Sequence, residues 1–332
     1  MLSDFVEHLW GRITCPDRSK FEGGCILIRY QVIFIMKIKN LLLPLILLGL
    51  STSTVLAQSK KIKHVVLVGF DGFGAYALPK AEMPNLKKMM QEGTYSTHVR
   101  TVLPSSSAVN WASMIMGAGP TAHGYTEWDS KVPEIPSTTK TANGMFPSLF
   151  NAVASKNPKA QFAVVHSWPG IGYLIDNKVV QKVINTKDDD EAALNTTVDI
   201  IMKEKPTIMF VHFDQPDGVG HNIGHNTPEY YAELKQVDRR IGTLQQAVKD
   251  VGIAGETIFV IAADHGGTGK GHGGKSLAEV EIPWVMTGPG VPRGKEIKET
   301  LMIYDIAPTL TWLLGAPLDA AWRGQAIKAF QQ

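Results

Sequence analysis

Continuous apolar runs alternate with helix-like stretches from residue 64 onward. Runs rich in β-branched residues at 64–70, 161–166, 207–213 and 257–263 are typical of buried strands, and residues 95–102 also look extended. Helical spacing occupies the segments between them, at residues 86–92, 108–116, 147–156, 189–205 and 228–251. This alternation predicts an α/β fold with a mainly parallel sheet and helices on both faces.

Acidic residues follow three of the predicted strands. Asp71 comes directly after the first, Asp214 and Asp217 follow the run at 207–213, and Asp264 follows the last. Ligand sites in open parallel sheets lie at the carboxyl ends of the strands, so we expect a polar site at this edge. Asp214 stays ambiguous, since no motif spacing selects it over Asp217.

No internal repeat, low-complexity tract or Pro/Gly/Ser-rich linker divides the chain after residue 58. The 332 residues, 44% of them apolar, are enough for a large core. We therefore expect a single domain over residues 58–332, with residues 119–141 as a loop or small lid over the site.

The segment 36–57 has the features of a signal peptide: a Met, two lysines, an apolar run at 41–50 and small residues ending at Ala57. The apolar run is too short to span a bilayer comfortably, so no stable membrane anchor is expected. We expect export to the periplasm or the cell exterior, with cleavage near Ala57. Because a signal peptide normally starts the chain, residues 1–35 are interpreted as a non-native extension or a wrongly assigned start.

Composition narrows the chemistry further. Both cysteines, Cys15 and Cys25, lie upstream of the signal segment, so the expected mature chain has no thiol for a disulfide, a lipid anchor, catalysis or metal binding. Metal ligands must therefore come from His and carboxylates. With 33 Lys+Arg against 31 Asp+Glu, the formal charge of +2 indicates no surface for a nucleic-acid polymer.

Six side chains of metal-ligand type are expected at the sheet edge: Asp71, Asp217, His221, Asp264, His265 and His272. Asp217 and His221 are four residues apart in what reads as a glycine-relaxed loop, and His272 lies in a second glycine-flanked loop. Three carboxylates and three imidazoles suit a borderline cation such as zinc, and they exceed the three or four ligands of one ion. The pattern therefore predicts two divalent ions.

A nucleophile completes this hypothesis. Ser107 lies at the start of the predicted helix 108–116, where metal coordination and the helix N-terminus favour an alkoxide. Taken singly, Ser107 reads as a helix N-cap, an acid after a strand as a turn former, and each histidine as a loop residue. Their joint placement at strand ends favours a site instead. His212 and His225 are interpreted as structural or supporting residues.

These residues resemble the alkaline phosphatase superfamily, specifically its type I phosphodiesterase/nucleotide pyrophosphatase branch, over nearly all of residues 62–327. The motifs that carry the resemblance are Gly69-Phe-Asp71-Gly, Pro104-Ser-Ser-Ser107-Ala-Val-Asn110, His123-Gly124, Asp217-x-x-x-His221, Ala263-Asp264-His265-Gly, Gly271-His272-Gly and Tyr304-Asp-Ile-Ala-Pro-Thr-Leu310. The resemblance implies an alkaline-phosphatase-like three-layer α/β/α sandwich with a mainly parallel central sheet.

The resemblance also implies a division of the ligands. One zinc would be held by Asp217, His221 and His272. The other would be held by Asp71, Asp264, His265 and the Ser107 oxygen. The nucleophile of this branch is usually Thr, and the spacing to His123-Gly124 selects Ser107 over Ser105 and Ser106.

Substrate recognition departs from the family pattern. Trp128 occupies the position where the branch commonly has an Asn that binds a phosphate oxygen, and an indole can donate a hydrogen bond but not accept one. Asn110, one helical turn beyond Ser107, is an alternative donor, unless it only packs in the helix. Asn110, Glu127 and Trp128 are therefore the candidate substrate contacts. The sulfatase sequence Cys/Ser-x-Pro-x-Arg is absent, which disfavours a sulfatase.

The function expected is an exported two-metal hydrolase of small-molecule phosphate esters, acting on phosphodiester or nucleotide pyrophosphate bonds through a covalent phospho-Ser107 intermediate. A phosphomonoesterase or a phosphonate or phospho-sugar hydrolase on the same scaffold is the alternative. An inactive metal- or carbohydrate-binding protein is a weaker one. The sequence predicts neither the leaving group nor the oligomeric state.

Overall fold

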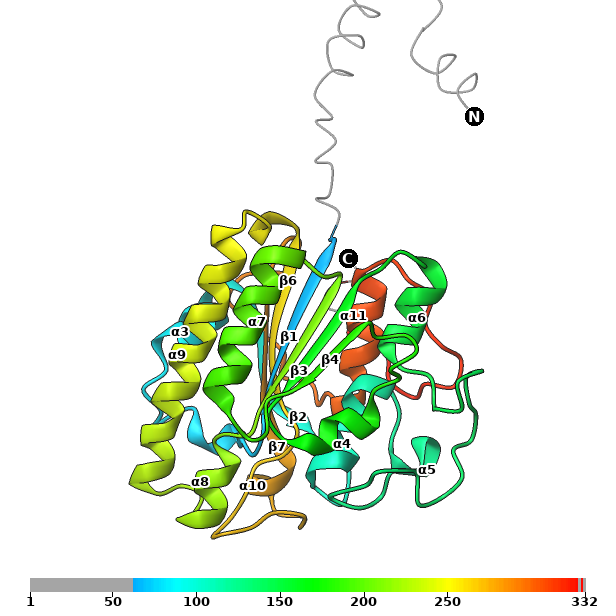
Figure 1. Ribbon diagram of the computed structural model, residues 1–332. Helices are drawn as coiled ribbons and strands as arrows, with labels where there is room; N and C mark the ends of the chain where they lie inside the picture. The colour runs from blue at the N-terminus through cyan, green and yellow to red at the C-terminus, as the bar shows by residue number, and fades with distance from the viewer. Residues whose placement is uncertain (1–61, 328–329, 331–332) are drawn as a thin grey trace, which may run out of the picture. The chain divides into compact units, whose positions relative to one another are not determined.

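A sheet of eight strands, in the order β4-β3-β5-β1-β6-β7-β2-β8, forms the middle layer of the computed structural model (Figure 1). The strands are β1 (His64–Phe70), β2 (Thr94–Arg100), β3 (Phe162–His166), β4 (Lys182–Asn185), β5 (Ile208–Phe213), β6 (Thr257–Ala263), β7 (Glu281–Thr287) and β8 (Lys295–Glu296). Neighbouring strands are parallel except where β7 pairs with β6 and β2. The predicted mainly parallel sheet is thus confirmed.

The structure describes residues 62–327 and Phe330. The predicted extension 1–35, the predicted signal peptide 36–57 and both cysteines lie outside the described residues. Within the described part, no helix is long and apolar enough to cross a membrane.

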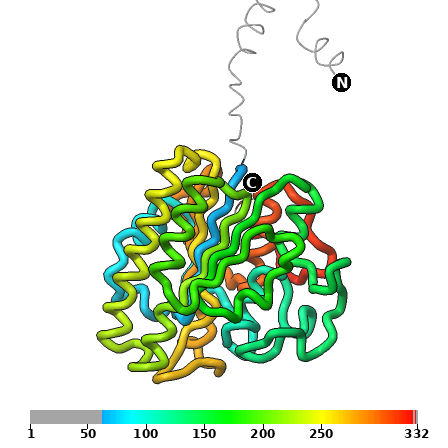
Figure 2. Tube along the Cα trace, in the orientation of Figure 1, coloured from blue at the N-terminus to red at the C-terminus, as the bar shows by residue number. Residues whose placement is uncertain are grey.

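Helices cover both faces of the sheet, as Figures 1 and 2 show. One face carries α3 (Pro84–Glu92), α7 (Asp190–Glu204) and α9 (Pro228–Asp250), and the other carries α4 (Ser107–Met116), α6 (Leu149–Lys156) and α11 (Ile306–Leu313). The short helices are α5 (Pro120–His123), α8 (Asp217–Asn222) and α10 (Leu277–Val280). The described residues therefore form the predicted three-layer α/β/α sandwich.

Strand β1 shows why a continuous apolar run predicts a strand in this protein. It lies between β5 and β6, where Val65 pairs with both Ile208 and Ile258. Its residues from Val65 to Phe70 are buried. A strand covered by helices on both faces is apolar throughout rather than alternating, which gives the continuous run seen in the sequence.

Strands β4 and β8 were not predicted, and two further elements near the site and inside the sheet differ from the sequence prediction. The supposed glycine-relaxed loop at Asp217 is the short helix α8. Strand β7 was not predicted, and it contains Pro283, which disfavours an interior strand because it cannot donate to the ladder. The β2–β7 register shifts between Ser96 and Val99, opposite Pro283, so this irregularity accommodates the proline.

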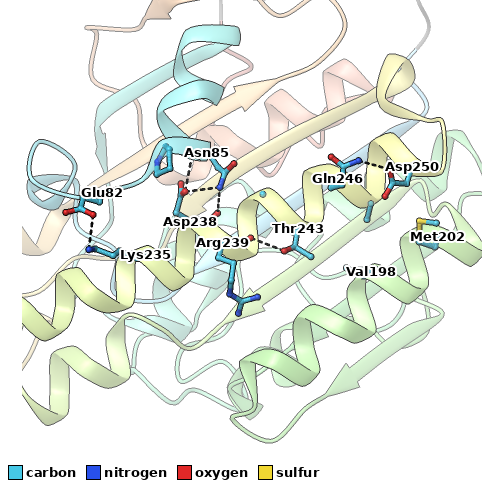
Figure 3. A pocket seen from close by; sticks show the side chains of 13 residues that line it. Glu82, Asn85, Val198, Met202, Lys235, Asp238, Arg239, Thr243, Gln246 and Asp250 are labelled. Carbon is cyan, nitrogen blue, oxygen red and sulfur yellow. Dashed lines mark hydrogen bonds and ion pairs between the residues drawn. The ribbon is translucent and has the colours of Figure 1, made fainter.

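A groove of about 840 Å³ runs between α3, α7 and α9 (Figure 3). Polar side chains along it serve the fold: the Asp238 carboxylate accepts hydrogen bonds from the backbone N–H groups of Asn85 and Leu86, at the start of α3. Lys235 pairs with Glu82 at 2.8 Å. None of the predicted site residues lines this groove.

Candidate metal centre

The carboxyl ends of the neighbouring strands β5, β1 and β6 bring the predicted acids together. Asp71 follows β1, Asp217 opens α8 just after β5, and Asp264 follows β6. Backbone hydrogen bonds fix these ends to one another: the Asp217 N–H donates to the Asp71 carbonyl at 3.1 Å, and the Gly72 N–H donates to Asp264 Oδ1 at 3.2 Å. The sheet therefore sets the spacing of all three carboxylates.

Three buried side chains surround Nε2 of His265, and with His265 they form the first group. Ser107 Oγ lies 3.2 Å from this nitrogen, Asp264 Oδ2 lies at 3.2 Å and Asp71 Oδ1 at 3.3 Å. Neither carboxylate oxygen has a hydrogen-bond partner among the described residues. Buried anionic oxygens without partners are costly, so this arrangement fits a cation at their centre.

The protonation of His265 supports the same conclusion. Its Nδ1 lies 2.8 Å from the Gly266 carbonyl, which places a hydrogen on Nδ1 and directs Nε2 at the oxygens. Burial lowers the pKa of His265, but the charges of Asp264 and Asp71 outweigh it and raise this pKa to about 10. Burial and the charge of Asp71 likewise raise the pKa of Asp264. The centre thus attracts a positive charge, which a divalent ion supplies as well as a proton.

A second group lies next to the first. Nε2 of His221 is 3.1 Å from Asp217 Oδ2 and 3.1 Å from Nε2 of His272. Nδ1 of His221 faces the Lys270 carbonyl, and Nδ1 of His272 faces the Ser105 carbonyl. With both Nδ1 atoms donating, two Nε2 lone pairs point at each other, and a shared cation resolves their repulsion.

Helix α8 explains the spacing of the second group. Positions four apart lie on one helical face, so Asp217 and His221 meet one turn apart. The rings of His265 and His272 stack with centroids 3.7 Å apart, which makes the two groups adjacent. Asp217 lies within reach of both groups. The structure thus gathers all seven predicted ligand and nucleophile residues in one place.

Among the three serines, only Ser107 directs its hydroxyl into the buried group. Ser105 Oγ donates to the Gly274 carbonyl at 2.7 Å. Ser106 is the N-cap residue of α4, and its buried hydroxyl has no partner among the described residues. Ser107 is the first residue of α4, whose positive end favours an anionic oxygen.

Two residues support Asp71: His212, which the sequence analysis interprets as a structural or supporting residue, and Trp111, which it missed. Trp111 Nε1 donates to Asp71 Oδ2 at 3.1 Å, and His212 Nε2 lies 3.1 Å from the same oxygen. Burial would raise the pKa of Asp71, but the neighbouring imidazoles of His212 and His265 outweigh burial and hold this pKa well below its usual value. The support leaves Oδ1 to face the metal position. Trp111 lies four residues, or one helical turn, after Ser107. This spacing was the only feature of the sequence that could have placed Trp111 near the site.

Asn110, one of the three candidate substrate contacts, is buried in the fold. Asn110 is fully buried, its Oδ1 accepts from the Val102 N–H, and its Nδ2 faces the carbonyls of Val102, Pro104 and Ser106. The prediction of Asn110 as a substrate donor is therefore corrected, because its amide holds the loop before Ser107.

Trp128 and Glu127 remain available for a substrate. The Trp128 side chain is 58% exposed, and its carbonyl accepts from the Ala108 N–H in the first turn of α4. Glu127 is exposed beside it. Trp128 thus lies next to the N-terminus that carries Ser107.

The α/β/α sandwich, with acidic and imidazole groups gathered at the carboxyl edge of its sheet, defines an alkaline-phosphatase-like protein with a candidate metal centre. The sequence profile described as type I phosphodiesterase / nucleotide pyrophosphatase matches residues 65–270. The chain belongs to this family.

Curated relatives resemble this chain over part of their length. A venom phosphodiesterase of Macrovipera lebetinus is 26% identical over 219 residues, which cover 61% of this chain and 25% of the relative. The bis(5'-adenosyl)-triphosphatase ENPP4 of Homo sapiens is 26% identical over 240 residues, covering 69% of this chain and 53% of the relative. The chain thus spans from a quarter to about half of these relatives.

Solved structures share the fold. An inactive variant of murine ectonucleotide pyrophosphatase/phosphodiesterase 5, in complex with AMP, superposes with a TM-score of 0.64 at 15% identity, covering 81% of this chain and 99% of that one. A 2-O GAG sulfatase gives a TM-score of 0.63 at 14% identity, covering 80% and 73%. At these identities the likeness shows the fold alone, and it confirms the alkaline-phosphatase-like class.

Proposed function

We propose that this chain is an exported, metal-dependent hydrolase of small-molecule phosphate esters, which cleaves phosphodiester or nucleotide pyrophosphate bonds with Ser107 as its nucleophile. The contact of Ser107 Oγ with the buried group carries this proposal, since Asp71 Oδ1 and Asp264 Oδ2 in that group have no hydrogen-bond partner within residues 62–327. Membership of the type I phosphodiesterase/nucleotide pyrophosphatase family supports it. Export rests on the signal-like segment 36–57.

Two divalent ions, proposed to be zinc, fit the donor set. Asp217, His221 and His272 would hold one. Asp71, Asp264, His265 and Ser107 Oγ would hold the other. When bound, such ions supply Lewis-acid stabilisation of negative charge on the serine oxygen and on the phosphate.

Ser107 performs the covalent step in this proposal. Its oxygen attacks phosphorus, the bond from phosphorus to the leaving oxygen breaks, and the hydroxyl proton passes to solvent. Water then attacks the phosphorus of the phosphorylated Ser107, and the bond from phosphorus to Oγ breaks. A proton from that water restores the Ser107 hydroxyl, and the phosphate product is released. The N-terminus of α4 favours the negative charge that gathers at this point, and the loop held by Asn110 keeps Ser107 in position.

The test compares Ser107→Ala with Ser106→Ala in the zinc-loaded protein. Ser107→Ala should abolish turnover while metal content stays near two per chain. Ser106→Ala is the matched control, because that hydroxyl makes no cap hydrogen bond. Turnover by Ser107→Ala would refute the nucleophile assignment.

A substrate panel separates the reaction classes. Bis(nitrophenyl) phosphate, nitrophenyl phosphate and nitrophenyl sulfate are compared with added zinc, together with a dinucleotide polyphosphate. A preference for the diester or polyphosphate supports the proposal, and a preference for the monoester indicates the phosphomonoesterase alternative. Zinc binding without turnover on any ester would indicate a binding protein.

A further inference from the structure

His225 occupies an unusual position behind the candidate metal centre. Its side chain is buried, and its Nε2 lies 3.6 Å from Oδ1 of the predicted ligand Asp217. Neither atom has a hydrogen-bond partner among the described residues. Two buried polar atoms of complementary kind, each unpartnered and facing the other, indicate an interaction that closes with a small shift.

The backbone around His225 is shaped to receive its ring. A methyl group at Gly220, inside α8, would lie 2.4 Å from Nε2 of His225. A methyl group at Gly267, just after Asp264 and His265, would lie 2.2 Å from the same atom. Helix α8 and the segment after His265 therefore both leave space for this imidazole. The backbone N–H of His225 donates to the Gly269 carbonyl at 2.7 Å.

Tyr76 contacts the other ring nitrogen of His225. Its hydroxyl lies 3.4 Å from Nδ1 of His225. A carboxylate oxygen only accepts hydrogen bonds, so the pair with Asp217 is satisfied when Nε2 carries the hydrogen and Nδ1 accepts from Tyr76. The chain of groups then runs from the Tyr76 hydroxyl through His225 to Asp217 Oδ1.

We infer that His225 is a positioning residue for Asp217: it engages Oδ1 and so reserves Oδ2 for the ion shared with His221 and His272. Asp217 lies within reach of both candidate groups, and the direction of its two oxygens decides which ion it serves. This inference rests on the metal centre of the proposed function.

Zinc affinity, measured by competition with a chromophoric chelator, tests the inference without any substrate. His225→Leu removes the donor, and we expect the weaker of two zinc ions to bind about 10- to 100-fold less tightly, as for other residues that orient metal ligands. His225→Gln keeps a donor and should stay within a few-fold of the parent protein. Tyr76→Phe, which touches no predicted ligand, should give a smaller loss.

Controls separate positioning from general destabilisation. His64→Leu removes another histidine. His64 is the first residue of β1, where its ring contacts the Pro206 carbonyl, so this change should leave zinc affinity unchanged. The thermal midpoints of the zinc-free proteins show whether each variant folds. If His225→Leu fails to fold, the inference is tested by the zinc affinities of His225→Gln and Tyr76→Phe.

Two results would overturn the inference, and they differ from each other. If the parent protein binds zinc and both His225→Leu and Tyr76→Phe bind it equally tightly, His225 has no positioning role while the proposed function stands. If the parent protein binds no zinc, the metal centre itself is wrong.

Discussion

Gly69 tests how the fold positions Asp71. A methyl group at Gly69 would lie 2.4 Å from Cη2 and 2.5 Å from Cζ3 of Trp111, the residue whose indole N–H holds Asp71 Oδ2. Trp111 is fully buried, so its ring cannot turn out into solvent to relieve the contact. Overpacking of this kind costs about 1–3 kcal/mol, and we expect Gly69→Ala to lower the free energy of unfolding by about 2 kcal/mol.

The cause is checked in a second background. Trp111→Phe removes the two ring atoms that a methyl group at Gly69 would meet, so the same Gly69→Ala change should cost about 1–2 kcal/mol less there. Urea unfolding of the four zinc-free proteins, followed by circular dichroism, measures this coupling.

Gly119→Ala is the control for Gly69→Ala, because the nearest atom to a methyl group there is Val102 Cγ1 at 3.8 Å. Its effect should stay within about 0.5 kcal/mol. Costs for Gly69→Ala and Trp111→Phe that add within about 0.5 kcal/mol would refute the steric account.

Four further outcomes are expected. Asn110→Ala should lower the free energy of unfolding by about 2–3 kcal/mol in urea titrations, because several buried backbone groups lose their partner; a loss below about 0.5 kcal/mol would contradict this role. Trp128→Ala should leave stability within about 0.5 kcal/mol, since the side chain is 58% exposed, but raise KM; an unchanged KM would remove Trp128 from the substrate contacts. Burial lowers the pKa of His123 to about 3, so below pH 6.5 only the unfolded chain takes up its proton. Stability should therefore fall as pH drops from about 6.5 toward 3, by about 1.4 kcal/mol per pH unit from this group, and His123→Gln should lose that part of the slope. Chelation should lower the thermal midpoint, since zinc at 1,000 times its Kd contributes about 4 kcal/mol to stability; an unchanged midpoint would argue against the metal centre.

The sequence by itself determined the parallel sheet and the acids at its edge. Strands β1, β5 and β6 are buried on both faces, so each reads as a continuous apolar run that ends near an acid or at one. The apolar spacing of residues 108–116 and the glycine that follows them also predicted helix α4. These signals are local, because each depends on the burial and backbone preference of neighbouring residues.

Only the tertiary structure decided which polar groups support the candidate ligands. Trp111 and His212 meet Asp71 across 40 and 141 residues of chain. His225 lies close to Asp217 because glycines in α8 and in the segment after His265 leave room for its ring. The same holds for Asn110, which reads as a possible donor in the sequence yet has its amide engaged by the backbone of residues 102–106. The hydrogen-bond partners of buried groups depend on how distant segments pack together. Local residue patterns cannot predict that packing.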